Sequence, residues 1–224
     1  MRLKNSAGDF PTIVVLEGAD GSGKSFQAGE VAQQLRDSGM RVVEPTKDPR
    51  RRLRKIYKEL ISGSSDFPSP ETSLLLGLSD YADALHRFRT APADVMLCER
   101  YCYSAIADAI ALGLDREKAS QLTNLFPTPA ITLFIDIEAG IAFQRKGECS
   151  LAEAGGPEFS REYPTLRESF IAYQEAVRGA YHYLGTAGKI PNLAIIDGTL
   201  PREDVTKSIM RELSIRAASA RKAP

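Results

Sequence analysis

Eight consecutive residues near the start of this chain have the types and the spacing needed to hold phosphate groups. They are Gly18, Ala19, Asp20, Gly21, Ser22, Gly23, Lys24 and Ser25. Glycines allow a tight turn whose backbone N–H groups point at phosphate oxygens, a lysine at this spacing reaches the β- and γ-phosphates, and the serine hydroxyl can hold Mg²⁺. The loop therefore predicts that the chain binds a nucleoside triphosphate, with Mg²⁺ as cofactor.

A second charged group, Glu99-Arg100-Tyr101, follows an apolar run. A carboxylate that ends a strand beside a phosphate-binding loop is the usual second anchor for Mg²⁺, so we assign the metal to Ser25 and Glu99. The planar guanidinium of Arg100 offers paired donors that match a phosphate. The alternative interpretation is a surface salt bridge at the end of a strand, because such pairs are common and weak.

The elements that must position these groups can be predicted from hydrophobic periodicity. Five short apolar runs indicate buried parallel strands, at residues 12–16, 41–44, 94–98, 130–135 and 193–196. Helical patterns lie between them, at about 26–37, 50–62, 70–90, 103–112, 115–125, 138–146, 165–184 and 202–216. This alternation predicts an α/β fold, with a five-stranded parallel sheet and helices on both faces. In such sheets ligands bind beyond the carboxyl ends of the strands, where the loop and Glu99-Arg100 lie.

The composition limits the domain organisation and the classes of partner. A length of 224 residues suits one domain; we expect it to span 1–216, before a small basic tail at 217–224 that frays. The formal net charge is zero, so nothing indicates a nucleic-acid or membrane partner. No apolar run approaches the roughly 20 residues that cross a bilayer, and the first nine residues have no signal-peptide core. Cys98, Cys102 and Cys149 show no metal or disulfide spacing, which favours a reducing, cytoplasmic location.

Motifs in the expected order along nearly the whole chain resemble those of the thymidylate kinases, a family of P-loop nucleoside-monophosphate kinases. The residues that carry the resemblance are Glu17-Gly18-Ala19-Asp20-Gly21-Ser22-Gly23-Lys24-Ser25, Thr46-Lys47-Asp48-Pro49, Glu99-Arg100-Tyr101 followed by Ser104 and Ala107, the strand from Pro129 to Asp136, Arg145, and Ile196-Asp197-Gly198. The resemblance implies a P-loop kinase fold with a small lid, which we expect at about 145–168. It also implies ATP and a nucleoside monophosphate as substrates, and a homodimer.

The resemblance implies a role for each matching residue. Asp20 would meet the sugar hydroxyl of the acceptor nucleotide, and Arg100 would hold the acceptor's phosphate. Lys47 would stand near the same phosphate, as a point charge where the family has an arginine. Arg145 would flank the adenine of ATP or the transferring group. Lys24, Arg100, Arg145 and Lys47 are therefore the predicted catalytic residues.

The predicted acceptor site contains departures from the family pattern. The family has a phenylalanine that stacks on thymine and an arginine that bonds to its edge; Gly77 and Tyr81 stand at those two places here. A glutamine of the family is also missing, because Asp108-Ala109 stands there. A site built around one base edge discriminates through such contacts, so the preferred base is expected to differ. We count Asp20, Arg54, Tyr81, Arg100 and Tyr101 as acceptor-binding residues.

The lid and the basic run at 49–55 give weaker indications of which arginines bind the substrates. The lid sequence from 148 to 157 is glycine-rich and acidic, which leaves Arg161 and Arg167 as its candidates to reach the phosphates. The basic run belongs to an amphipathic helix whose cationic face is solvated, with Arg54 turned toward the acceptor.

The sequence therefore predicts a nucleoside-monophosphate kinase that transfers the γ-phosphoryl group of ATP to dTMP or a related (deoxy)pyrimidine monophosphate. One alternative is a deoxynucleoside kinase, in which Glu17 serves as the carboxylate base near the acceptor hydroxyl. Another is a non-catalytic nucleotide-binding protein that kept the loop and lost turnover.

Overall fold

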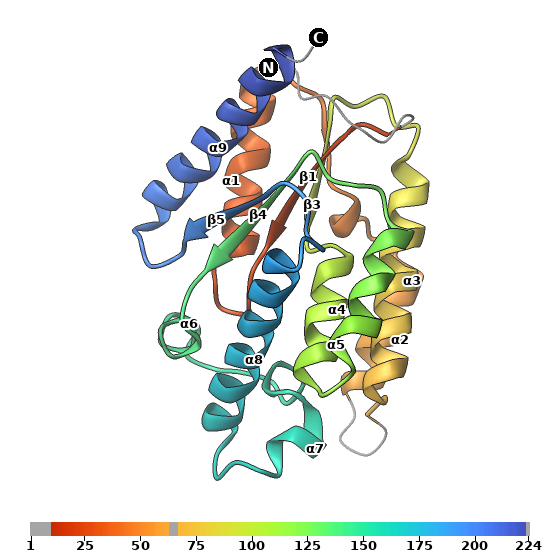
Figure 1. The fold of residues 1–224 in the computed structure, drawn as a ribbon, viewed down its shortest axis with the longest axis vertical. Helices are drawn as coiled ribbons and strands as arrows, with labels where there is room; N and C mark the ends of the chain where they lie inside the picture. Colours follow the sequence, from red (N-terminus) through yellow and green to blue (C-terminus); the bar gives the residue numbers. More distant parts are fainter. Residues whose placement is uncertain (1–9, 63–66, 223–224) are drawn as a thin grey trace.

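A parallel sheet of five strands forms the centre of the protein in a computed structural model that describes residues 10–62 and 67–222 (Figure 1). The strands are β1 (Thr12–Glu17), β2 (Val42–Val43), β3 (Val95–Glu99), β4 (Ile131–Asp136) and β5 (Leu193–Asp197). Their order in the sheet is β2-β3-β1-β4-β5, and every neighbouring pair is parallel. The predicted α/β fold with a five-stranded parallel sheet is confirmed, and each strand lies at its predicted place to within two residues.

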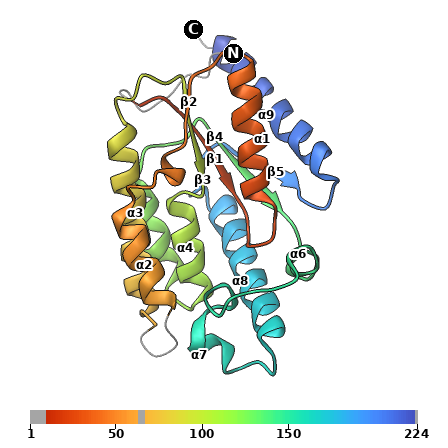
Figure 2. The same ribbon diagram turned by 180° about the vertical axis from the view of Figure 1, so that it is seen from behind.

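Helices cover both faces of the sheet (Figures 1 and 2). On one face α1 (Lys24–Asp37) and α9 (Arg202–Lys222) pack through Val31, Leu35, Ile209 and Leu213, all fully buried. The other face is covered by α3 (Pro70–Phe88), α4 (Cys102–Ala111) and α8 (Leu166–Thr186). The sheet is therefore buried on both sides, as its continuous apolar strands require.

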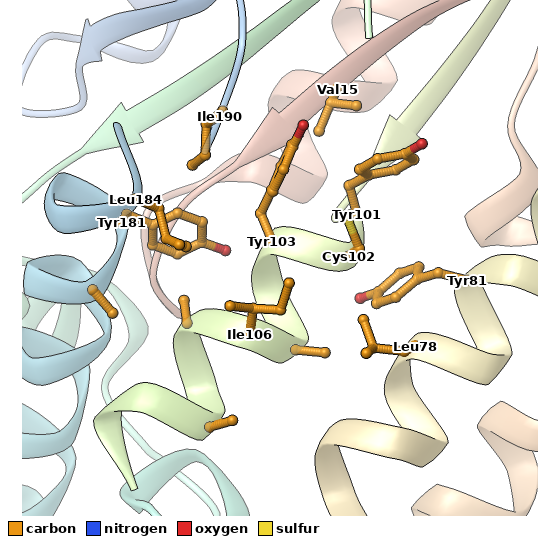
Figure 3. Close-up of a cluster of buried hydrophobic side chains, with 14 of the residues drawn as sticks. Val15, Leu78, Tyr81, Tyr101, Cys102, Tyr103, Ile106, Tyr181, Leu184 and Ile190 are labelled. Carbon is orange, nitrogen blue, oxygen red and sulfur yellow. The ribbon is translucent and has the colours of Figure 1, made fainter. Parts of the chain in front are cut away.

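The second face carries an aromatic core that fixes α4 and α8 against β1 and β3 (Figure 3). The rings of Tyr101 and Tyr103 have centroids 5.4 Å apart, and Tyr181 stacks on Phe134 at 4.7 Å. Burying a large apolar side chain contributes about 1.5–3 kcal/mol, so this cluster is a main source of stability. It makes a rigid platform directly beneath the carboxyl ends of β1 and β3.

The remaining helices are short or lie at the edges of the molecule. They are α2 (Arg52–Ser62), α5 (Arg116–Gln121), α6 (Ala139–Lys146) and α7 (Gly156–Ser160), with 3₁₀ turns η1 (Pro45–Lys47), η2 (Leu122–Leu125) and η3 (Ala152–Ala154). Of these, η1, η3 and α7 were not predicted. Figure 1 shows α6 and α7 beyond the carboxyl ends of the strands; α6 ends at the start of the lid predicted at about 145–168, and α7 lies within it.

A buried ion pair ties α2 and η1 to α3. The guanidinium of Arg51 pairs with the Asp80 carboxylate, and both side chains are less than one tenth exposed. Arg51 also donates to the carbonyl of Thr46 at 2.7 Å, and Asp80 accepts the backbone N–H of Arg54 at 3.1 Å. Every polar group of the pair is thus engaged, which such burial requires. The hydrogen bond to Asp80 also holds the backbone of Arg54 beside α3.

The two ends of the chain bear on three predictions. The frayed tail expected from residue 217 is wrong for residues 217–222, since α9 continues to Lys222. Ala217 is 5% exposed, and alanine, arginine and lysine favour helices. Residues 1–9, on which the absence of a signal-peptide core was judged, and the last two residues of the tail lie outside the described residues. Among the helices that the structure describes, none is long and apolar enough to cross a membrane.

Candidate active site

The loop between β1 and α1 turns around its glycines and opens directly into the helix. Gly21 and Gly23 have φ values of 85° and 88°, which glycine adopts without strain, and α1 begins at Lys24. A Cβ atom on Gly21 would lie 2.7 Å from the carbonyl oxygen of Ala142 on α6, so no larger residue fits there. The loop thus presents backbone N–H groups and the start of a helix at one point, an arrangement suited to an anion.

Two cavities meet at this loop. The first, which we call the α1–α9 cavity, has a volume of about 740 Å³ and runs from the loop to residues 198–202 and α9. The second, the α3–α4 cavity, has about 400 Å³ and runs between α2, α3, α4 and η3. Asp20, Lys24, Ser25 and Glu153 line both cavities. Two ligands bound in them would therefore have their near ends at Lys24.

Three charged groups stand where the cavities join. The Lys24 ammonium donates to the carbonyl of Ala19 at 3.0 Å and to Asp20 Oδ1 at 3.1 Å, and Asp20 also pairs with Arg100. Burial raises the pKa of Asp20, but Arg100 and Lys24 lower it more, so its pKa is well below the usual range. Burial and the charge of Arg100 lower the pKa of Lys24. Lys24 and Arg100 thus share one carboxylate, Asp20, while Glu153, which also lines both cavities, pairs with Lys146.

Ser25 and Glu99 bring two oxygen ligands together beside Lys24. The Ser25 hydroxyl donates to the carboxylate of Glu99, and both residues line the α3–α4 cavity. The backbone N–H of Glu99 donates to the Thr46 hydroxyl at 3.2 Å, which fixes the end of β3. Hydroxyl and carboxylate oxygens are the donors that Mg²⁺ takes, so this pair fits the ion.

Arg100 reaches the loop because its backbone is in a rare conformation. Its φ is 70°, in the left-handed region that non-glycine residues seldom adopt. Its N–H donates to the carbonyl of Leu16 at 2.9 Å, and its side chain turns to Asp20 and Ser104. Such strain persists only where the surroundings hold it in place.

The carboxylate of Glu17 stabilises the backbone and side chains that surround Arg100. Its carboxylate is fully buried and accepts the N–H of Tyr101 at 2.8 Å and the hydroxyls of Ser104 at 2.6 Å and Tyr181 at 2.7 Å. Burial raises the pKa of Glu17, although these hydrogen bonds and the charge of Arg100 oppose the rise. Glu17 therefore joins β1, α4 and α8 just below Arg100, and its carboxylate does not reach either cavity.

We expect Glu17→Ala to lower the free energy of unfolding by about 3 kcal/mol, because the substitution leaves several buried donors without an acceptor. Urea denaturation of both proteins measures this value. Glu30→Ala, which removes an exposed carboxylate of α1, is the matched control. A loss below about 1 kcal/mol for Glu17→Ala would contradict the structural role given to this carboxylate.

The last turn of α6 contributes two cations to the α1–α9 cavity. The guanidinium of Arg145 donates to the carbonyls of Gly198 at 2.5 Å and Thr199 at 3.0 Å, two residues that also line this cavity. Lys146 pairs with Glu153 at 2.8 Å, and its charge also interacts with that of Asp20. It is therefore a second candidate to bind the phosphates. Sequence reasoning missed Lys146; its position beside Arg145 was the available signal.

The α3–α4 cavity has an unusual wall at Gly77. A Cβ atom there would lie 2.9 Å from the Cβ of Ala105, so the two helices touch where the resemblance leads one to expect a stacking phenylalanine. Tyr81, one turn further along α3, points toward α4 (Figure 3) and lines the cavity. Arg54 lines it too, with its guanidinium 5.6 Å from the ring centroid of Tyr57.

Four predicted residues are not brought into either cavity. Lys47 pairs with Glu44 at 2.5 Å within its own turn, and Tyr101 is buried with its hydroxyl on the carbonyl of Pro127. Arg167 lies over the ring of Phe143, and Arg161 lines a pocket beside α7 that adjoins the α3–α4 cavity at Phe67 and Gly155. Both cavities also contain residues that sequence reasoning did not assign to them: Arg202 and Glu153 in the first, and Tyr57, Phe67, Asp108 and Tyr173 in the second.

The chain was compared with known proteins. Residues 16–209 match the family model described as thymidylate kinase. A thymidylate kinase of Dinoroseobacter shibae is 29% identical over 214 residues, which cover 92% of this chain and 97% of the relative. A thymidylate kinase of Coprothermobacter proteolyticus is 28% identical over 211 residues, with 91% and 100% covered. A protein of Pyrococcus horikoshii described as a probable thymidylate kinase is 29% identical over 207 residues, with 88% and 93% covered.

Proposed function

The chain belongs to the thymidylate kinase family, and we propose that it transfers the γ-phosphoryl group of ATP to the phosphate of dTMP or a related pyrimidine nucleoside monophosphate. Phosphorylation of dTMP by ATP is the function of this family, and the chain is an ATP-dependent nucleotide kinase. We propose which nucleotide is the acceptor of this chain and which residues act on it.

The observation that carries the proposal is the meeting of two cavities at one lysine. ATP would occupy the α1–α9 cavity, with its adenine along Arg145 and its γ-phosphate at Lys24. The acceptor would occupy the α3–α4 cavity, with its phosphate at Arg100. Reaction between two phosphates needs them in line at short distance, and this arrangement supports such a pose.

The reaction asks little covalent chemistry of the protein. An oxygen of the acceptor's phosphate forms a bond to the γ-phosphorus while the bond to the bridging oxygen of ADP breaks. Lys24 and Arg100 would offset the negative charge that spreads over the transferred group, and Lys146 would add to this once ATP draws it from Glu153. Mg²⁺ held by Ser25 and Glu99 would offset charge on the β- and γ-phosphates.

The position of Glu17 argues against the deoxynucleoside kinase alternative. It required Glu17 to take a proton from an acceptor hydroxyl, but this carboxylate is fully buried and already accepts three hydrogen bonds. A base must come within hydrogen-bond reach of the proton that it removes. The geometry therefore favours a phosphate, which needs no such base, as the acceptor group.

An assay of the purified protein with ATP against a panel of nucleosides and nucleoside monophosphates tests the proposal. We expect ADP release with at least one pyrimidine monophosphate, and none above background with any nucleoside. Phosphorylation of nucleosides alone would overturn the choice of acceptor. Tight binding of ATP without any turnover would favour the non-catalytic alternative.

We further propose a cytoplasmic homodimer. The three cysteines are free, as in a reducing compartment. Ile56 and Leu60 on α2 and Leu75 on α3 are exposed apolar side chains that a second copy could cover. Sedimentation or light scattering would measure the oligomeric state directly.

A further inference from the structure

Gln174 on α8 joins the phosphate-binding loop to η3 through the two ends of one side-chain amide. Its Oε1 accepts the backbone N–H of Asp20 at 2.8 Å, and its Nε2 donates to the backbone carbonyl of Glu153 at 2.8 Å. Both partners are backbone groups of fixed polarity, so they determine which way the amide faces. Gln174 is 2% exposed and, as far as the structure describes the chain, lines neither of the two cavities. It therefore contacts the walls of the site and not the space that a substrate would occupy.

The first partner, Asp20, holds the two cations at the junction of the cavities. Its carboxylate pairs with Lys24 and with Arg100, to which the proposed mechanism assigns the transferred phosphate and the acceptor's phosphate. A shift of the Asp20 backbone would move this carboxylate and, with it, both cations. Because the bond to Gln174 fixes that backbone, it also fixes where the two cations lie.

The second partner, Glu153, belongs to a segment that forms a wall of the site. Ser150, Ala152, Glu153 and Gly155, which lie in or beside η3, line the α3–α4 cavity, and Glu153 also lines the α1–α9 cavity. The Glu153 carboxylate pairs with Lys146 at 2.8 Å. The position of η3 therefore sets one wall of the acceptor cavity and the place of the Lys146 charge.

A second buried side chain of α8 holds η3 without a hydrogen bond to the loop, as far as the described residues show. Ser169, which is fully buried, donates to the carbonyl of Ala154 at 2.7 Å, and its hydroxyl lies 3.0 Å from that of Ser160 on α7. Ser169 and Gln174 thus both hold η3, and Gln174 adds the bond to the loop. A comparison of the two side chains separates the anchoring of η3 from the link between η3 and the loop.

A glutamine suits this place for a chemical reason. Its amide carries an acceptor and donors on one planar group, so it can satisfy an N–H on one side and a carbonyl on the other. A buried backbone group that loses its partner is unfavourable, so without the amide the loop and η3 would shift toward other partners. A misplacement of about 1 Å in a reacting group can lower a rate by about a hundredfold.

We propose that Gln174 is a positioning residue that holds the Asp20 turn of the phosphate-binding loop and η3 at a fixed separation, and thereby aligns the donor phosphate with the acceptor phosphate. It acts through Asp20 on one side and through Glu153 on the other, and it touches neither substrate. This inference rests on the proposed function, because it takes the two cavities as the donor and acceptor sites.

Steady-state kinetics of the full chain test the effect on the reaction. Gln174→Met has a similar size but no amide, and should lower kcat by about tenfold to a hundredfold because the two phosphates lose their alignment. The dissociation constants of an ATP analogue with a β,γ-imido bridge, and of the pyrimidine monophosphate with the highest turnover, should change by less than about fivefold. The groups proposed to contact the two nucleotides remain in this variant.

Two further variants serve as rescue and control. Gln174→Asn keeps a donor and an acceptor on a shorter stem and should recover part of the lost kcat. Ser169→Ala is the matched control, and its kcat should stay within about threefold of wild type. Thermal unfolding checks that each variant is folded. If Gln174→Met is not, Gln174→Asn replaces it: its shorter amide reaches one backbone group at a time, so its kcat should be at least about fivefold below that of Ser169→Ala.

Amide hydrogen exchange gives a readout that does not depend on turnover. In Gln174→Met we expect faster exchange in the peptides that cover residues 18–25 and 150–156, because both ends of the link are released. In Ser169→Ala the increase should be confined to residues 150–156. If Gln174→Met left the exchange of residues 18–25 unchanged, the link between the loop and η3 would be refuted.

The kinetic outcomes separate this inference from the proposed function. A kcat for Gln174→Met within about threefold of wild type, with lower stability, would reduce Gln174 to a structural role and overturn the inference. An equal loss of kcat in Ser169→Ala would assign the effect to the anchoring of η3 and would overturn it as well. Absence of turnover by the wild-type protein would contradict the proposed function and the effect on the reaction, whereas the exchange result would still decide whether Gln174 joins the loop to η3.

Discussion

Replacing Lys24 by alanine is expected to reduce kcat for phosphoryl transfer by about a thousandfold while the protein stays folded. Lys24 is 6% exposed, and its ammonium group lies where the two cavities meet, 3.1 Å from Asp20 Oδ1. A desolvated cation fixed at that point stabilises the transferred group far more than a solvated one. Because alanine favours helices, the start of α1 should be kept.

An ADP-release assay at saturating ATP and acceptor measures this effect. Lys55→Ala, which removes an exposed lysine of α2, is the matched control and should leave kcat within twofold. A thermal unfolding curve within a few degrees of wild type would show that Lys24→Ala is folded. A loss of less than about tenfold would mean that the α1–α9 cavity does not hold the reacting phosphate at Lys24.

Replacing Arg100 by alanine should lower kcat/KM for the acceptor by at least about a hundredfold and change the KM for ATP by less than threefold. Arg100 lines the α3–α4 cavity but not the α1–α9 cavity, so it should act on one substrate. Arg100→Lys keeps the charge but loses the planar fork, and should recover only part of the activity. The positive φ is equally unfavourable for all three residues, so backbone strain should not decide the result.

Initial rates with each substrate varied in turn test this separation. Arg211→Ala, an exposed arginine of α9, serves as the control. If the KM for ATP rose as much as that for the acceptor, Arg100 would belong to both sites. If neither changed, the acceptor's phosphate would bind elsewhere.

The sequence predicted the elements that carry strong local signals. The strands could be found because parallel strands buried on both faces are continuous apolar runs, as in residues 12–16. The phosphate-binding loop and Arg100 could be found because they follow such strands. By contrast, η3 and α7 lie in a glycine-rich segment without periodicity, and they are fixed by long-range contacts such as the hydrogen bond from Gln174 to the carbonyl of Glu153.

Single side chains in the site were harder to predict than elements. Lys47 follows a strand as Arg100 does, yet the 3₁₀ turn η1 directs it to Glu44, a pairing that spacing alone does not show. Tyr101 directly follows Arg100 but is buried, with its hydroxyl donating to the carbonyl of Pro127, a contact that spacing alone does not show. Asp108 and Gly77 could be recognised as departures, but only the packing of α3 on α4 shows that they share one cavity.

Phosphorus NMR of the complete reaction tests the central claim most directly. ATP, Mg²⁺ and the acceptor that gives turnover are incubated with the protein, and the products are identified by their phosphorus signals. Transfer to the acceptor's phosphate predicts ADP and a nucleoside diphosphate in equal amounts, with a new β-phosphate signal and little inorganic phosphate. ADP accompanied by inorganic phosphate alone, or a monophosphate formed from a nucleoside, would contradict the account.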